Sequence, residues 1–223
     1  MTSTQRSFHH VIAIDGPAAS GKSSVALGLS QDLGFIYVNS GAIYRAITWH
    51  FLQKKIHPEE SEGIDGALQV ADITCRLQDN ESRILIDGVD PGEHLRDDSV
   101  NESVAGVSQF PAVRQIVAKK LHEQAQSHDL IVEGRDIGSV VFPDTPYKFY
   151  IDASPEVRLQ RRTAQGGRDE IAMRDRVDSS RAVSPLVIAK DAHVIDTSHL
   201  TIQEVIGEIL GVLEKTGLRT RRF

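Results

Sequence analysis

The stretch that decides the fold is HVIAIDGPAASGKSS, residues 10–24. It begins with a short run rich in β-branched residues, His10–Asp15, which is typical of a buried parallel strand. The next eight residues, GPAASGKS (Gly16–Ser23), fit the pattern GxxxxGK followed by Ser or Thr, and a helical pattern continues to Leu33. A glycine-rich loop between a strand and a helix is the context in which this pattern forms a phosphate-binding P-loop.

This loop predicts binding of a nucleoside triphosphate. The backbone N–H groups of such a loop point at a phosphate, and the N-terminus of the following helix adds positive potential. Lys22 is expected to reach the β- and γ-phosphates, and the hydroxyl of Ser23 is expected to bind Mg²⁺. The alternative is a glycine turn with a structural role only, although a chance match occurs in roughly one chain in a hundred.

The alternation of strand and helix continues outward from the loop. FIYV (Phe35–Val38) predicts a second strand, and a helix is expected over Ala42–Gln53. Three more core strands are predicted by DLIVEG, YKFYID and AHVIDTS, which are residues 129–134, 147–152 and 192–198. Strands that alternate with helices form right-handed βαβ units around a parallel sheet. We therefore predict an α/β fold of the P-loop NTPase type, with three αβα layers and a central parallel sheet of five strands.

Caps and turn residues mark the remaining helices. A helix is predicted over residues 111–127, with Pro111 in its first turn, and another opens with Ser154 as N-cap and Pro155 at the first helical position. The last helix carries a capping box of Thr201 and Glu204. The fold is thus expected to end with a helix on the outside of the sheet.

Residues 58–100 follow a different pattern from the rest of the chain. ITCRLQ and SRILIDGVD alternate like exposed antiparallel strands, with a turn at Asp79-Asn80. This segment predicts a small α+β insert. The expected organisation is a core at 8–57 and 101–217, an inserted subdomain at 58–100, a lid at 158–174 within the core, and flexible termini at 1–7 and 218–223.

Composition narrows the classes of function. The chain has 223 residues, a net charge of −6 and 40% hydrophobic residues, which is the balance of a globular protein and not of a basic nucleic-acid or anionic-membrane binder. A single cysteine, Cys75, excludes an intramolecular disulfide and a cysteine metal cage. No apolar run approaches about 18 residues, so we expect a cytoplasmic protein without a membrane span.

Two segments outside the P-loop are candidates for a second phosphate site. GRDIG (Gly134–Gly138) follows a predicted strand at the end where open α/β sheets bind ligands, which favours functional roles for Arg135 and Asp136 over a strand-end ion pair. VNSGAIYRA carries Ser40, Tyr44 and Arg45 around a turn into a helix. The alternative for this stretch is a capping serine and a solvated arginine.

Arginines gather on two later helical segments. Arg158, Arg161 and Arg162 share one helix face at i, i+3 and i+4, and a second face combines Arg174, Asp178 and Arg181. Either set alone could be a solvated surface. Both flank the glycine-rich segment AQGGRDE, which we interpret as a lid, and lids that bring arginine to phosphates are typical of phosphoryl transfer. The guanine-reading motif NKxD of switch GTPases is absent from the sequence.

Taken in order, these motifs resemble those of bacterial cytidylate (CMP) kinases. The matching segments are GPAASGKS, SGAIYRA, FPAVR, EGRDIGSVVFP, ASPEVRLQRR and SSRAVSPL, which run from about residue 10 to 200. The resemblance implies transfer of a phosphoryl group from ATP to CMP or dCMP, with Mg²⁺, in a monomer that has no nucleic-acid or membrane partner.

The resemblance also implies roles for single residues. It assigns catalytic roles to Lys22 and Arg135 and to the three arginines at 158, 161 and 162. The implied ATP-binding residues are Gly16, Pro17, Ala18, Ala19, Ser20, Gly21, Lys22, Ser23 and Ser24. The implied substrate-binding residues are Ser40, Tyr44, Arg45, Arg114, Arg135, Asp136, Arg174, Asp178 and Arg181. Within that set, Arg114 and Asp136 are expected to read the base, and Arg174 and Asp178 to hold the ribose.

Three departures from the family pattern bear on substrate choice. Asn39 stands where the family usually has Asp, and Ala105 stands where a base-contacting serine is expected, with Ser108 as a substitute one turn on. The segment between Arg162 and Arg174 is also shorter than the family's lid. The alternatives are a P-loop kinase for another small acceptor such as UMP or shikimate, and a non-catalytic nucleotide-binding module.

Overall fold

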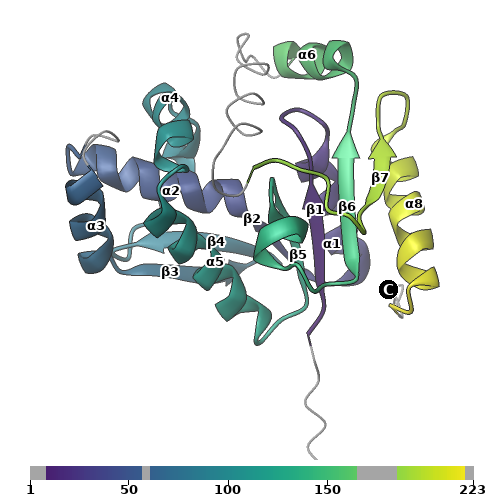
Figure 1. The fold of residues 1–223 in the computed structure, drawn as a ribbon, viewed down its shortest axis with the longest axis horizontal. Coiled ribbons are helices and arrows are strands. Elements are labelled where there is room, and N and C mark those ends of the chain that lie inside the picture. The colour runs from purple at the N-terminus through teal and green to yellow at the C-terminus, as the bar shows by residue number, and fades with distance from the viewer. Residues whose placement is uncertain (1–8, 57–60, 165–184, 219–223) are drawn as a thin grey trace, which may run out of the picture.

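Seven strands form one sheet, in the order β3-β4-β2-β5-β1-β6-β7 (Figure 1). The structure is a computed structural model that describes residues 9–56, 61–164 and 185–218. Its strands are β1 (Val11–Asp15), β2 (Ile36–Asn39), β3 (Ile73–Gln78), β4 (Glu81–Ile86), β5 (Leu130–Gly134), β6 (Tyr147–Asp152) and β7 (His193–Asp196). Its helices are α1 (Lys22–Leu33), α2 (Ser40–Gln53), α3 (Ser61–Val70), α4 (Asp98–Val107), α5 (Pro111–Ala125), α6 (Pro155–Ala164) and α8 (Ile202–Lys215). Two short helical turns, Gly92–Arg96 and Ile137–Val141, complete the described elements.

The strand carrying the P-loop lies inside the sheet. β1 pairs in parallel with β5 on one side and β6 on the other, while β2 and β7 pair in parallel with the outer edges of those strands. The connection from β1 passes over β5 to reach β2, and the connection from β5 passes over β1 to reach β6. The two crossovers therefore run in opposite directions along the sheet, and they diverge between β5 and β1. In open α/β sheets that is where ligands bind, at the carboxyl ends of the strands.

The predicted count of five strands is too low, because the insert adds a hairpin to the sheet. β4 joins β2 in parallel through the pair Tyr37 and Glu81, and β3 pairs antiparallel with β4. The turn between β3 and β4 lies at Asp79-Asn80, as predicted, and both residues adopt positive φ angles of 51° and 60°. The five remaining strands are the predicted parallel core.

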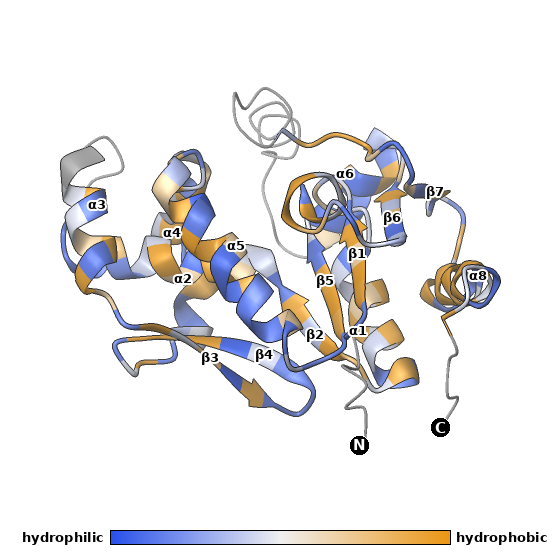
Figure 2. Cartoon of the chain, turned by 60° about the horizontal axis from the view of Figure 1, so that its bottom comes forward, coloured by the Kyte–Doolittle hydropathy of each residue, from blue (hydrophilic) through white to orange (hydrophobic). Residues whose placement is uncertain are grey.

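Side chains from alternate positions of the strands fill two hydrophobic cores, one on each face of the sheet. Along β1, Val11 and Ala13 pack with α2, α3 and α5, whereas Ile12 and Ile14 pack with α1 and α8. Accordingly, β1 and β5 are hydrophobic along most of their length in Figure 2, while β3 and β4 mix hydrophobic and hydrophilic residues. The three predicted layers are therefore present.

Helix ends follow the predicted caps with one correction. The capping box of Thr201 and Glu204 starts α8, and Ser154 accepts the N–H of Val157 at the start of α6. In contrast, the cap of α2 is Asn39, whose side chain accepts the N–H of Ala42 at 3.0 Å, and not Ser40. Asn39 is the better cap because its side-chain carbonyl reaches the first turn of the helix from an extended backbone.

One helix was missed and one predicted segment is only partly described. α4 buries Val100, Val104 and Val107, whose spacing at i, i+4 and i+7 is a helical signal. The helix spans residue 100, where we predicted the insert to end and the core to resume. Of the predicted lid, residues 158–164 belong to α6, and residues 165–174 lie outside the described part of the chain. Among the described helices, none combines the length and the apolar character needed to cross a membrane.

Candidate active site

The P-loop packs tightly against β6. Gly16, with φ 147°, brings its backbone so close to this strand that an added Cβ would lie 2.0 Å from the carbonyl oxygen of Ile151. Ala19 and Gly21 also adopt positive φ angles, of 59° and 97°. Positive φ is costly for alanine, so the loop is held by its surroundings in a shape suited to a backbone anion site.

Lys22, the first residue of α1, lies folded against the loop that carries it. Its ammonium donates to the carbonyl of Pro17 at 2.6 Å and contacts Ser20 Oγ at 3.5 Å, and only 5% of the residue is exposed. A buried ammonium at a helix N-terminus repels other cations and attracts an anion. The predicted phosphate-binding lysine therefore lies at the P-loop, with its charge directed at the loop.

Ser23 lies beside a carboxylate that our sequence interpretation missed. Its hydroxyl donates to Glu133 Oε2 at 2.9 Å, and the phenol of Tyr37 donates to Glu133 Oε1 at 2.6 Å. Glu133 is 4% exposed. Burial, with the neighbouring Glu133 carboxylate as the second cause, raises the pKa of Tyr37 well above its ordinary value, so the phenol stays a donor.

A signal for Glu133 was present in the sequence. It ends the apolar run of β5, the strand next to the P-loop strand, and P-loop NTPases place a Mg²⁺-binding carboxylate in that position. The hydroxyl of Ser23 and the carboxylate of Glu133 form the oxygen donor set that Mg²⁺ prefers, so these two residues fit the ion.

Asn39 contributes to this cluster only through its amide. Its oxygen is occupied as the cap of α2, and its Nδ2 donates to the phenol oxygen of Tyr37 at 3.4 Å. The carboxylate expected at position 39 from the family pattern is thus absent, and Glu133 is the carboxylate that contacts Ser23 in the structure.

The proposed base-reading pair forms a buried ion pair. Arg114, from α5, donates through Nη2 to Asp136, which follows β5, and through Nη1 to the carbonyl of Ser108 at 3.0 Å. The two residues are 7% and 4% exposed, and the guanidinium lies 5.6 Å from the ring centroid of Tyr44. Arg114 Nε is buried without a hydrogen-bond partner within the described structure. Such a donor needs an acceptor, which a bound ligand can supply.

The segment after β2 brings two further predicted residues to the same area. Ser40 donates from its hydroxyl to the carbonyl of Glu133 at 2.8 Å, which links α2 to the end of β5. Gly134 makes this contact possible, because a Cβ there would lie 2.6 Å from Ser40 Oγ. Arg45 donates to the carbonyl of Gly41 at 3.3 Å and is half-buried.

Two of the predicted lid arginines contact the P-loop backbone in this structure. Arg161 Nη1 donates to the carbonyl of Ser20 at 3.2 Å, and Arg161 Nη2 donates to the carbonyl of Thr197 at 2.7 Å. Arg158 Nε donates to the carbonyl of Ala153, and Nη1 lies 3.4 Å from the carbonyl of Ala18. These contacts hold the outer side of the loop. Arg162 lies one residue further along α6 and is half-buried.

Three predicted substrate residues cannot be placed. Arg174, Asp178 and Arg181 lie outside the described residues, so their roles stay predictions from the sequence. Most of the remaining predicted residues follow three strands: the P-loop after β1, Ser40, Tyr44 and Arg45 after β2, and Arg135 and Asp136 after β5. Arg114 belongs to α5, and Arg158, Arg161 and Arg162 belong to α6. This arrangement places a phosphate-binding loop beside a second group of arginines, which defines a P-loop kinase.

Comparison with known proteins identifies the kinase family. The family model of cytidylate kinase matches residues 12–215. The cytidylate kinase of Caldanaerobacter subterraneus is 40% identical over 92% of this chain and 94% of its own, and that of Rhodococcus opacus is 41% identical over 93% and 96%. The chain therefore belongs to the cytidylate kinase family of nucleoside monophosphate kinases.

Solved structures support the fold. A sugar kinase from a Janibacter species, solved without ligand, superposes with a TM-score of 0.51 over 92% of this chain and 95% of its own, at 14% identity. The protein TT1252 from Thermus thermophilus gives a TM-score of 0.50 over 94% and 98%, at 18% identity. At these identities the likeness concerns the fold alone.

Proposed function

We propose that the chain transfers the γ-phosphoryl group of ATP to CMP and dCMP, forming ADP and CDP or dCDP. Family membership supports the acceptor class, and the P-loop supports the donor. The observation that carries the proposal is the buried ion pair of Arg114 and Asp136. Nε of Arg114 has no hydrogen-bond partner among the described residues. The pair offers a donor and an acceptor side by side, next to the ring of Tyr44.

The chemistry of this pair complements cytosine. The cytosine edge presents an amino donor and ring acceptors, so a carboxylate and a guanidinium can each find a partner. Uracil presents a carbonyl where cytosine has its amino group, and this carbonyl would oppose the carboxylate of Asp136. We therefore propose preference for CMP over UMP. Ser108 donates its hydroxyl to the carbonyl of Ala105 at 3.0 Å, so a base would meet the oxygen lone pairs of Ser108 and not its proton.

The remaining roles follow from charge. Residues 16–24 would hold the triphosphate, with Lys22 on the β- and γ-phosphates, and Ser40, Arg45 and Arg135 would hold the phosphate of CMP. Mg²⁺, held by Ser23 and Glu133, would neutralise phosphate charge during transfer. The chain itself supplies positioning and electrostatic stabilisation, and no covalent enzyme intermediate is needed. The proposal includes a monomer that acts in the cytoplasm on nucleotides, without nucleic-acid or membrane partners.

The arginines of α6 are proposed to have two different roles in phosphoryl transfer. Because Arg158 and Arg161 contact P-loop carbonyls, we propose that they support the loop in the conformation described, and that Arg162 is the better candidate to approach the transferred group. A kinetic comparison of Arg161→Met and Arg162→Met separates these roles. A supporting residue affects the Kd of ATP, whereas a residue on the transferred group affects kcat.

The proposed function is tested by measuring ADP release with CMP, dCMP, UMP, AMP, GMP and shikimate in parallel. We expect CMP and dCMP to stimulate ADP release most, and UMP at least tenfold less in kcat/KM. Arg135→Ala should lower the CMP-dependent rate by at least 100-fold while the protein stays folded. A chain for which shikimate or UMP is the best acceptor, or for which no acceptor stimulates ATP consumption, would contradict the proposal.

A further inference from the structure

The crossover from β5 to β6 contains no α-helix. Residues 135–146 must return along the whole length of β1, and their one regular element is the five-residue helical turn Ile137–Val141. Ile137 and Val141 bury their side chains in the core beside β1. A short segment of this kind has too few internal hydrogen bonds to hold its own shape. Its position therefore depends on contacts with the strands beneath it.

Asp15 holds the beginning of this segment. It is the last residue of β1, it is 4% exposed, and its two carboxylate oxygens accept the N–H groups of Ile137 at 2.8 Å and Gly138 at 2.7 Å. Asp136, which stands at the N-cap position of the turn, makes no capping hydrogen bond with its side chain. The first two N–H groups of the turn are thus capped from a neighbouring strand, by the residue that also precedes the P-loop.

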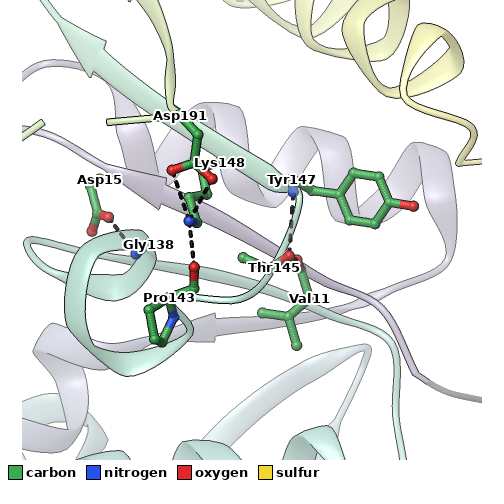
Figure 3. A network of polar contacts seen from close by, with 8 residues as sticks. All are labelled: Val11, Asp15, Gly138, Pro143, Thr145, Tyr147, Lys148 and Asp191. Atoms are coloured by element: carbon green, nitrogen blue, oxygen red, sulfur yellow. Dashed lines mark hydrogen bonds and ion pairs between the residues drawn. The ribbon is translucent and has the colours of Figure 1, made fainter. Parts of the chain in front are cut away.

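Lys148 holds the far end of the segment. It lies opposite Ala13 in the pairing of β6 with β1, so its side chain shares a face of the sheet with Asp15. Its ammonium donates to the carbonyl of Pro143 at 2.6 Å and to both oxygens of Asp191 at 2.8 Å (Figure 3). At 6% exposure, Lys148 is a buried ammonium that has its partners in place.

Gly138 lets the two supports come together. A Cβ at this position would lie 3.1 Å from Cγ of Lys148 and 3.4 Å from Oδ2 of Asp15. The aliphatic part of Lys148 therefore packs on the turn while the carboxylate of Asp15 binds its N–H groups. Figure 3 shows the two side chains reaching the same segment from β1 and β6.

We propose that Asp15 and Lys148 are positioning residues for the acceptor: by holding the Ile137–Pro143 segment at both ends, they fix Arg135 and Asp136 relative to the P-loop. Arg135 and Asp136 directly precede the segment, so a displaced turn would displace them. Asp15 and Lys148 themselves contact neither ATP nor CMP in this proposal. It rests on the proposed function, because it assumes that Arg135 and Asp136 bind CMP.

The decisive variant is Asp15→Asn, compared with Asp129→Asn. An amide at position 15 keeps the volume of the side chain but has one acceptor, so the N–H of Ile137 or Gly138 would face an NH₂ group. Asp129 also accepts a backbone N–H, that of His10 at 2.6 Å, but it is exposed and lies just before the start of β5, away from the site. The same chemical change is thus made at a strand end that the proposal leaves uninvolved.

The measurement is calorimetric titration of each variant with CMP and, separately, with ADP, together with hydrogen exchange of the amides of Ile137 and Gly138. We expect Asp15→Asn to weaken CMP binding about tenfold, to change ADP binding less than threefold, and to speed exchange at these two amides. Asp129→Asn should leave all three unchanged. Equal CMP affinity in wild type and Asp15→Asn would overturn the inference, and so would a parallel loss of CMP and ADP affinity, which indicates a general structural role.

A second variant keeps the inference testable if Asp15→Asn does not fold. Lys148→Met retains the packing of the side chain and removes its ammonium, while Asp191 is exposed enough to bind water instead. Selective weakening of CMP binding by severalfold supports the inference, and unchanged CMP binding by the folded variant overturns it. If the wild-type chain does not bind CMP, the proposed function fails and this inference fails with it. If the wild-type chain binds CMP and both variants bind it equally well, this inference fails but the proposed function stands.

Discussion

The two halves of the site are built in different ways. The donor half is one continuous loop, residues 16–24, whose shape depends on local glycines and on the start of α1. The acceptor half takes residues from α2, α5 and the end of β5, which are far apart in the chain. A contiguous motif can be recognised in the sequence. A site made of residues that are far apart in the chain depends on tertiary contacts such as those of Asp15 and Arg114. We expect the donor half to tolerate changes that leave the loop and its contacts with α6 intact, and the acceptor half to respond to changes in several parts of the chain.

The largest effect is expected from Lys22→Ala. Removal of the ammonium at the P-loop should lower kcat by at least 1,000-fold, because charge neutralisation supplies most of the rate in phosphoryl transfer. CMP affinity should change less than threefold if the two halves are built independently. Titration with CMP and single-turnover kinetics with ATP measure the two quantities. A large loss of CMP affinity would show that the halves are not separate.

The second prediction concerns pH and Asp15. Burial raises the pKa of Asp15 to about 6 from an ordinary value of 3.8, with hydrogen bonds from Gly138 and Ile137 acting in the opposite direction. Between these values the folded chain holds a proton that the unfolded chain has lost, so this residue's contribution to the free energy of unfolding falls as pH rises from about 4 to 6. Relative to Asp15→Asn, the wild type should lose about 2 kcal/mol between pH 4.5 and 7.5.

Denaturant unfolding of both proteins at the two pH values measures this difference. Other titrating groups are common to wild type and Asp15→Asn, so they cancel in the comparison. A difference that does not change with pH would mean that Asp15 is ionised normally. A difference that changes with the opposite sign would mean that its hydrogen bonds outweigh its burial.

A smaller effect is expected when the outer support of the P-loop is removed. Arg161→Met deletes the hydrogen bonds to Ser20 and Thr197 but leaves the acceptor half untouched. The Kd of ATP should rise about tenfold, which corresponds to roughly one lost charge-assisted hydrogen bond. CMP affinity should stay within twofold. Lys120→Met, which removes an exposed ion pair with Glu123, serves as the control, and an ATP affinity unchanged by Arg161→Met would contradict a supporting role.

The smallest effect is expected from Asn39→Asp. Asp and Asn are comparable helix caps, so the free energy of unfolding should change by less than about 0.5 kcal/mol. Activity with Mg²⁺ should be maintained or rise up to about threefold, since a second carboxylate would then lie near Ser23 and Glu133. Steady-state kinetics over a range of Mg²⁺ concentrations tests this. A fall in kcat of tenfold or more would indicate that repulsion with Glu133 dominates.

The sequence predicted what depends on local pattern. Strands such as His10–Asp15 and Tyr147–Asp152, the turn at Asp79-Asn80 and the caps at Ser154 and Thr201 all depend on neighbouring residues, and the structure agrees with them closely. The cap of α2 was misassigned because Asn39 and Ser40 are both good capping residues, and only the backbone conformation decides between them.

Long-range contacts are what local pattern could not supply. The seven-stranded sheet requires that β4 pair with the edge of β2, and the local pattern of residues 73–86 does not indicate which strand β4 pairs with. Glu133 had a local signal, the end of an apolar strand, but its contacts with Ser23 and Tyr37 join residues that are 110 and 96 positions apart in the chain. The contact of Arg161 with the P-loop likewise depends on the position of α6 over the sheet.

The hairpin at the edge of the sheet has a consequence for how far this enzyme could be reduced in size. Without β3 and β4, the backbone groups on the outer side of β2 would lose their partners, including the N–H of Tyr37, which donates to the carbonyl of Asn80 at 2.8 Å. A bare strand edge invites pairing between molecules. A chain shortened by residues 58–100 is therefore expected to aggregate, because the hairpin covers a strand edge of the sheet.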